Sequence, residues 1–377
     1  MDLRLSEEQQ LIRRSTREFA ETVVLSHVQQ MEDDHATPTG LVQEMAKMGM
    51  MGVCVPREFG GTGLGHLART VMLEEVGRTS AASAFLLQIC HLGIDPIVAA
   101  GNDAQKKQYL PALARGECLA ACAVTETTGG SDPASLRTEA RKDGGDYILS
   151  GRKVFITNAH VADTVVVVAR TGEGSKGLSA FLVDKGTKGF RAGRQEHKFG
   201  LFGCNTGELI FEDCRVPAAN LLGEEGQGLR IAFGSIGRIG RTGTAATALG
   251  ILNACLEDTV KHANGRQLYG AAIGKLQAIQ WQVSDIWLDS SIARQLCYRS
   301  SWLLDQGERC DAEVAAAKLF STEAAVRSAK KAIDVYGGYG YLKEYAVQRY
   351  FRDAECLIAS AGTSEVMRIV IANSALA

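Results

Sequence analysis

The hydrophobic periodicity of this chain changes twice, and the two changes limit the folds that it can adopt. Apolar residues recur at helical spacing up to about residue 118, form short β-branched runs between turns over 119–224, and return to helical spacing from 225. We therefore predict an α+β protein with a helical domain (1–118), a β-barrel or sandwich domain (119–224) and a four-helix bundle (225–377). A chain of 377 residues is long enough to give each domain a core.

Local signals support each part of this prediction. Ser6-Glu7-Glu8-Gln9 has the pattern of a capping box at the start of a helix. Helical spacing then predicts helices over 40–50, 66–78, 81–100 and 103–115, and longer ones over 244–264, 276–306, 312–337 and from 364. The runs in the middle are typical of antiparallel strands, and Val165–Val168 predicts a strand buried on both faces.

Charge and cysteine usage exclude several classes of function. The 41 Lys and Arg residues are balanced by 43 Asp and Glu residues without a basic cluster, which argues against binding to nucleic acid or an acidic membrane. The polar start and the absence of an apolar run of about 18 residues indicate neither a secretory signal nor a membrane span. Ten scattered cysteines, without a second pair or a histidine to complete a zinc site, indicate free thiols in the cytoplasm and no metal.

Six motifs stand in a fixed order along this layout. They are AVTETTGGSD (123–132), KVFITNA (153–159), GRQLYG (265–270), LQAIQ (276–280), GGYGY (337–341) and RDAECLIASAGTSE (352–365). Together they resemble the acyl-CoA dehydrogenase family over nearly the whole chain. The resemblance implies a three-domain subunit, bound FAD, an acyl-CoA substrate, a homotetramer built as a dimer of dimers, and electron-transfer flavoprotein or a similar electron acceptor.

The flavin-binding residues implied by the resemblance make chemical sense, because a flavin needs backbone donors, hydroxyl groups and flat apolar cover on one ring face. Phe155 stands where the family usually has Trp, and strand alternation predicts that its ring points the same way as the Thr157 hydroxyl. The predicted FAD-binding set is Cys122, Val124, Thr125, Gly130, Ser131, Phe155, Ile156, Thr157, Arg266, Leu268, Gln277, Asp334, Val335, Gly337, Gly338, Thr363 and Glu365.

Part of that set is expected to act across a subunit boundary. Arg266 and Gln277 resemble the pair that reaches the adenosine half of FAD in a neighbouring subunit, with Gly337 and Gly338 at the same place. Asp334 stands where the family more often has Gln, which weakens that contact. By itself, the glycine pair predicts only the end of a helix.

The residue that should remove the substrate proton is missing. Most family members carry this base as the Glu of an E-G-T turn, and that position here is Ala361. A minority carry it just before an arginine that corresponds to Arg241, and that position is Gly240. The resemblance places Ser131, Arg241, His91, Ala361 and Gly362 against the substrate, but none of them is a carboxylate within reach of the acidic proton.

Asp95 is the candidate for a relocated base. It is the only charged residue in LLQICHLGIDPIVAAG (86–101), which corresponds to the family's acyl-pocket helix, and His91 lies one turn away as a possible partner. Burial raises the pKa of a carboxylate toward a useful range. The alternative is structural, because Asp before Pro96 also has the pattern of a helix N-cap.

A base deep in the acyl pocket suits an unsaturated substrate. We predict oxidation of an alicyclic enoyl-CoA of the cyclohex-1-ene-1-carboxyl-CoA type by 1,4-elimination, a reaction that some relatives without the usual glutamate perform in anaerobic metabolism. The alternatives are a flavoprotein acyl-CoA lyase or desulfinase, an ordinary short- or medium-chain acyl-CoA dehydrogenase, and a non-catalytic flavin-, CoA- or DNA-binding protein. The sequence leaves the acyl group and the electron acceptor open.

Overall fold

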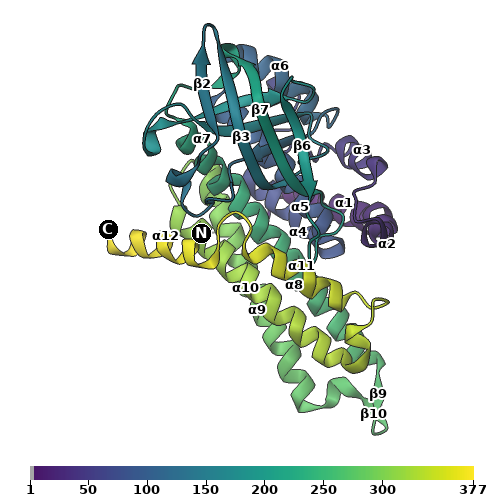
Figure 1. Cartoon of the computed structure of the whole chain (residues 1–377). Helices are drawn as coiled ribbons and strands as arrows, with labels where there is room; N and C mark the ends of the chain where they lie inside the picture. The colour runs from purple at the N-terminus through teal and green to yellow at the C-terminus, as the bar shows by residue number, and fades with distance from the viewer. Residues whose placement is uncertain (1–3) are drawn as a thin grey trace.

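The computed structural model describes residues 4–377 and has the three predicted parts (Figure 1). The sheet lies at the top of the view, a bundle of long helices extends below it, and the first helices pack beside the junction between them. The N-terminal part comprises α1 (Glu7–Phe19), a π-helix (Ala20–Val24), α2 (Leu25–Asp34), α3 (Thr39–Lys47), a short 3-10 helix (Arg57–Phe59), α4 (Gly65–Thr79), α5 (Ala81–Ala100) and α6 (Asp103–Ala114).

The first helix begins as the sequence predicts. Ser6 is its N-cap, and the Ser6 hydroxyl accepts a hydrogen bond from the Gln9 backbone while the Gln9 side chain accepts one from the Ser6 backbone. This reciprocal pair satisfies two backbone donors that a helix start leaves free. The capping box read from the sequence is therefore confirmed.

The middle part is one eight-stranded sheet with the order β6-β7-β3-β2-β4-β5-β8, to which β1 adds beside β4. Most neighbours are antiparallel as predicted, but β1 and β2 both pair with β4 in parallel. All four residues Val165–Val168 are buried, as predicted. The strands are β1 (Ala120–Ala123), β2 (Glu139–Asp143), β3 (Asp146–Thr157), β4 (Thr164–Arg170), β5 (Leu178–Asp184), β6 (Phe190–Gln195), β7 (Thr206–Pro217) and β8 (Leu221–Leu222).

The C-terminal part is helical. α8 and α9 are antiparallel neighbours joined by a small hairpin at the far end of the bundle, and α12 projects from its opposite end (Figure 1). The elements are α7 (Gly228–Ser235), a π-helix (Ile236–Arg241), α8 (Thr242–Gly265), β9 (Gln267–Leu268), β10 (Ala271–Ala272), α9 (Gln277–Asp305), α10 (Asp311–Tyr336), α11 (Val347–Ile358) and α12 (Ser364–Leu376). The predicted domain boundaries at 118/119 and 224/225 fall between α6 and β1 and between β8 and α7, and remain predictions.

Helix α5 is the core helix of the N-terminal part. Among the described helices it alone is long and apolar enough to cross a membrane, but 83% of its apolar window is buried inside the protein. Its N-cap is Ser80, whose hydroxyl accepts a hydrogen bond from the Ser83 backbone. Pro96 lies inside the helix, so Asp95 is not an N-cap and that alternative is wrong. Burial of the apolar helix outweighs the tendency of an Asp-Pro pair to start one.

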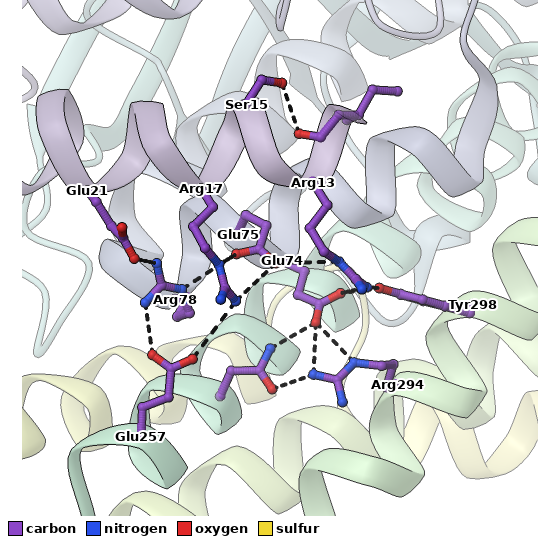
Figure 2. Close-up of polar contacts among 12 residues, drawn as sticks. Arg13, Ser15, Arg17, Glu21, Glu74, Glu75, Arg78, Glu257, Arg294 and Tyr298 are labelled. Carbon is purple, nitrogen blue, oxygen red and sulfur yellow. Dashed lines mark hydrogen bonds and ion pairs between the residues drawn. The ribbon is translucent and has the colours of Figure 1, made fainter. Parts of the chain in front are cut away.

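A network of buried ions joins the N-terminal helices to the bundle (Figure 2). Glu74 on α4 accepts hydrogen bonds from Asn253 on α8 at 2.9 Å and from Arg294 and Tyr298 on α9 at 3.0 and 2.6 Å. Its neighbour Glu75 accepts from Arg17 on α1 at 2.8 Å. Each carboxylate thus has an arginine partner, which is what a buried charge requires.

Candidate active site

A cavity of about 660 Å³ opens where the sheet meets the helices. Its walls come from α5, the loop after β1, the end of β3, the β6–β7 connection, the π-helix at 236–241 and the turn between α11 and α12. The structure brings together twelve of the predicted site residues here: Cys122, Val124, Thr125, Gly130, Ser131, Phe155, Ile156, Thr157, Arg241, Ala361, Gly362 and Thr363.

Phe155 lies in the cavity in an unusual backbone conformation. Its φ is +57°, and the pairing of β3 with β7 shifts register between Lys153 and Ile156. A bulge of this kind re-aims side chains. Phe155, Ile156 and Thr157 all contribute to the cavity wall, but the Ile156 side chain packs in the core of the sheet, on the face opposite to Phe155 as alternation predicted. The Phe155 side chain remains 64% exposed, which leaves an uncovered aromatic ring in the cavity.

The loop after β1 is held by a buried ion pair that sequence reasoning did not assign. The Lys153 ammonium group donates to Glu126 at 2.7 Å and to the Val124 carbonyl at 3.0 Å. Burial opposes ionisation of Glu126, but the Lys153 charge and two backbone donors, at Arg137 and Thr138, lower its pKa below the ordinary value. Both residues lie inside motifs quoted above. A lysine in a predicted strand, without a partner visible in the sequence, was the signal that could have revealed the ion pair.

The π-helix at Ile236–Arg241 forms the opposite wall. Its wider turns leave carbonyl groups without their usual α-helical partners, as π-helices at functional sites often do. Arg69 donates to the Ile239 carbonyl at 2.9 Å, and the Gln88 amide donates to the Gly240 carbonyl at 2.9 Å. The Gln88 side-chain oxygen is buried without a partner in the described part of the chain. Gln88 lines the cavity and was not singled out from the sequence.

The two positions that lack a carboxylate face each other. A Cβ atom built on Gly240 would lie 3.4 Å from the Ala361 Cβ, which is ordinary van der Waals contact. Ala361 has a φ of +57° and Gly362 a φ of +111°, so both belong to a tight turn after α11. An acidic side chain at either position would therefore enter the same part of the cavity.

Asp95 does not lie in that part of the cavity. Its carboxylate accepts hydrogen bonds from Ser235 and from Arg238, the latter at 2.8 Å, and it is not among the cavity-lining residues. An ion pair with Arg238 engages the carboxylate, and the role of Asp95 as the relocated base stays a prediction. Among residues 4–377, Glu196 is the one carboxylate that lines the cavity, and it is bound to Arg194 at 3.0 Å.

His91 is also placed differently from the prediction. It is buried outside the cavity, accepts a hydrogen bond from Arg69 at 3.0 Å and donates to the Met50 carbonyl at 2.8 Å. Burial and the Arg69 charge lower its pKa to about 3, so the ring is neutral at physiological pH. Its hydrogen-bond partners are Arg69 and Met50 rather than Asp95, and its substrate-binding role stays a prediction.

The remaining predicted residues lie elsewhere. Thr363 is the N-cap of α12, and Glu365 is an exposed residue in the first turn of that helix. Arg266, Leu268, Gln277 and the Gly337–Gly338 pair lie toward the far end of the bundle, near the β9–β10 hairpin (Figure 1). Asp334 forms an exposed ion pair with Lys330, and Val335 is buried in a small cluster with Ala263 and Ile273.

The cavity suits a flat, hydrogen-bonding cofactor such as a flavin. An exposed aromatic ring on one wall offers apolar cover, and the hydroxyl groups of Thr125, Ser131, Thr157 and Thr363 line the same space. Gly130 lets a ligand approach the backbone closely. The arrangement can therefore hold a ring system between the sheet and the α11–α12 turn, next to a partly apolar acyl pocket on α5.

Comparison with known families gives three matches that cover almost the whole chain. The N-terminal domain of acyl-CoA dehydrogenase matches residues 6–117, the middle domain matches 121–214, and the C-terminal domain matches 226–376. The chain is 41% identical over 372 residues to acyl-CoA dehydrogenase of Bacillus subtilis (strain 168), with 98% of each chain covered.

Two solved structures are similar throughout. Butyryl-CoA dehydrogenase from Megasphaera elsdenii has a TM-score of 0.98 and 34% identity, with 100% of each chain covered. A chain from a structural study of the electron transferring flavoprotein of Acidaminococcus fermentans and flavin-based electron bifurcation also has a TM-score of 0.98, with 38% identity and full coverage of both chains.

Proposed function

Because the chain belongs to the acyl-CoA dehydrogenase family, we propose that it oxidises an acyl-CoA thioester without a carboxylate of its own at either family position. Family membership establishes an acyl-CoA dehydrogenase that uses FAD. The observation that carries the proposal is the meeting of Gly240 and Ala361, whose Cβ positions are 3.4 Å apart in the cavity wall. A proton acceptor must lie within hydrogen-bond reach of the acidic carbon, and a hydrogen and a methyl group accept no proton.

The residues of the cavity divide into two groups by role. Bound FAD supplies the hydride acceptor. We assign the Phe155 ring to cover one face of the flavin and the Thr125, Ser131 and Thr363 groups to hydrogen-bond it, because they share one cavity. The acyl group then lies against Phe85, Ile89 and Leu92 of α5, which exclude water from the reacting carbons.

For the acyl group we propose an unsaturated alicyclic thioester of the cyclohex-1-ene-1-carboxyl-CoA type. Ala361, which lines the cavity, is smaller than the glutamate that most family members carry there, which favours an acyl group wider than a straight chain. Conjugation with the thioester also acidifies the γ-carbon, so that the proton leaves from a position that the usual glutamate does not serve. With Asp95 bound to Arg238, that proton goes to water or to a group that the ligand brings.

Anaerobic reduction of the FAD-loaded protein tests this proposal. We expect cyclohex-1-ene-1-carbonyl-CoA to bleach the flavin at least ten times faster than butyryl-CoA or octanoyl-CoA. Equal rates with the straight chains would reject the alicyclic proposal and leave an ordinary short-chain enzyme. Product formation without bleaching would indicate a lyase. A Glu196→Gln variant that loses reduction would show that the one cavity carboxylate is the base.

We also propose a homotetramer and electron-transfer flavoprotein as the acceptor. Trp281, Trp287 and Leu288 on α9 are exposed large apolar side chains, and Trp287 also lines a second cavity between α8 and α9. Such a surface needs a partner, and a second copy would bring Arg266 and Gln277 toward another subunit's cavity. Sedimentation analysis should give four subunits, and a monomer would reject the assembly.

A cytoplasmic location stays a prediction.

A further inference from the structure

Two buried cations beside the cavity lack an anionic partner. Arg241 lines the cavity with 8% of its surface exposed, and its Nε is buried without a hydrogen-bond partner in the described part of the chain. Lys318 on α10 is 0% exposed, and its ammonium group donates only to the carbonyls of Ile358 and Gly362, at 2.6 and 2.7 Å. Among residues 4–377 neither cation forms an ion pair with a carboxylate.

The two charges are close enough to affect each other. Burial and the charge of Arg241 together lower the pKa of Lys318 to about 8, while Glu323 and Glu365 oppose the shift. Burial also lowers the pKa of Arg241, against a weak opposing effect of Asp311. Two neighbouring buried cations are costly without an anion, since each has lost its hydration.

Arg241, Ala361 and Gly362 line the cavity, whereas Lys318 and Gly240 are buried behind its wall. Gly240 immediately precedes Arg241, and Lys318 holds the carbonyl of Gly362, which immediately follows Ala361. The side chains at 240 and 361 are a hydrogen and a methyl group in contact distance of each other. The only carboxylate that lines the cavity, Glu196, is already held by Arg194 on the β6–β7 connection.

We infer that Arg241 and Ala361 form, on the cavity wall, a seat for a carboxylate that is not part of the chain, with the charge of Lys318 buried behind it. The carboxylate comes either from the acyl group of the substrate, as in a dicarboxylic acyl thioester, or from a small free acid such as formate or acetate. In both cases it neutralises the two cations. The inference rests on the proposed function, because it identifies what fills the position left without a proton acceptor.

Binding of small carboxylates to the FAD-loaded protein is the first test. We expect formate and acetate to bind saturably by calorimetry in the millimolar range and to raise the thermal midpoint, and acetamide and chloride at equal ionic strength to do neither. We also expect formate to speed flavin reduction by butyryl-CoA at least tenfold, because it supplies a proton acceptor. Equal effects of acetamide, formate and chloride would overturn the inference.

A pair of thioesters of equal length distinguishes the two sources of the carboxylate. Glutaryl-CoA should bind at least ten times more tightly than pentanoyl-CoA, measured by the change in flavin absorbance, if the substrate brings the carboxylate. Formate should then compete with glutaryl-CoA, so that it weakens glutaryl-CoA binding and does not speed its oxidation. Equal binding of the two thioesters, together with rescue of butyryl-CoA by formate, would assign the seat to a free acid. Equal binding without rescue would reject the seat.

Two arginines on the same π-helix provide a matched comparison. Arg241→Gln removes the cavity cation and should abolish formate binding, whereas Arg238→Gln removes an arginine that pairs with Asp95 outside the cavity and should leave it intact. Ala361→Glu fills the seat with a chain carboxylate and should also abolish formate binding. This second variant keeps the test valid if Arg241→Gln does not fold. Formate binding that survives both Arg241→Gln and Ala361→Glu contradicts the inference. If formate binds but no acyl-CoA thioester reduces the flavin, the proposed function is rejected and the carboxylate seat is retained.

Discussion

Glu74 and Glu75 are as deeply buried as Lys318 and Arg241, but the two regions differ in how their charges are compensated. In the network of Figure 2, arginines from α1, α4 and α9 surround the two carboxylates. Beside the cavity, Lys318 donates to two carbonyl groups, and the Nε of Arg241 has no hydrogen-bond partner in the part of the chain that the structure describes.

This difference separates a structural role from a functional one. A network whose charges are satisfied inside the chain holds α1, α4, α8 and α9 together and needs no ligand (Figure 2). Cations that are left unsatisfied at a cavity wall lower stability in the free protein, and a ligand of opposite charge recovers that free energy on binding. The following predictions test this contrast, from the largest expected effect to the smallest.

Glu74→Gln should produce the largest effect, because it removes the charge that Arg294 pairs with while keeping the shape of the side chain. Arg294 then remains partly buried without a counter-ion, and breaking a buried ion pair costs about 3–5 kcal/mol of unfolding free energy. Denaturant unfolding followed by tryptophan fluorescence measures the change. The flavin reduction rate of the folded variant should not change, since Glu74 does not line the cavity.

The matched control is Glu257→Gln at the exposed edge of the same network. Glu257 pairs with Arg78 at 2.9 Å, but its side chain is 48% exposed. Exposed pairs contribute less than about 1 kcal/mol. Equal losses in the two variants would show that the network does not depend on burial, and the contrast between the two regions would fail.

Ala361→Glu should give the cations beside the cavity a carboxylate partner from the chain itself. A chain carboxylate beside Arg241 and Lys318 gains two cationic partners and supplies a proton acceptor, so the rate of flavin reduction by butyryl-CoA should rise by about 10²-fold. Stopped-flow absorbance of the flavin measures this rate. Ala359→Glu introduces the same side chain two residues earlier in the cavity wall and serves as the control. An equal increase in both variants would contradict the assignment of the seat.

Lys318→Met should change how stability depends on pH. The pKa of Lys318 is lowered to about 8 in the folded protein, so between pH 8 and 10.5 the unfolded chain binds the proton more strongly than the folded chain does. The stability of the wild type should therefore rise with pH across this window relative to the variant, by at most about 1.4 kcal/mol per pH unit. Below pH 8 the two curves should run parallel. Parallel curves throughout would show that Lys318 carries no penalty.

Much of the fold and of the flavin half of the cavity was predictable because local sequence determines it. The capping box at Ser6, the fully buried run in β4 and the hydroxyl and glycine residues after β1 need only a few neighbours to be recognised. The bulge at Phe155 was not predictable, because a shifted register depends on how β3 meets β7. Nor was the pairing of β1 with β4, which depends on the path of the intervening chain.

The acyl half of the cavity was harder to predict because its chemistry depends on contacts between distant segments. The sequence shows that Ala361 and Gly240 lack carboxylates, but not that their side chains meet. The burial of Lys318 beneath the α11–α12 turn has no local signal either. A charged residue in an apolar run suggests a functional group, yet its partner can lie far away in the chain.

Asp95 illustrates that limit and gives the smallest predicted effect. Its partners Ser235 and Arg238 follow it by 140 and 143 residues. Asp95→Asn keeps a hydrogen-bond acceptor for Ser235 and removes the charge that pairs with Arg238, whose side chain is 37% exposed. We expect a loss of about 1 kcal/mol in unfolding free energy and a flavin reduction rate within twofold of the wild type. A hundredfold slower reduction with unchanged flavin binding would restore Asp95 as the base. It would also place the proton acceptor in the compensated region of the molecule, and the contrast between paired structural charges and unpaired ligand-binding charges would no longer hold.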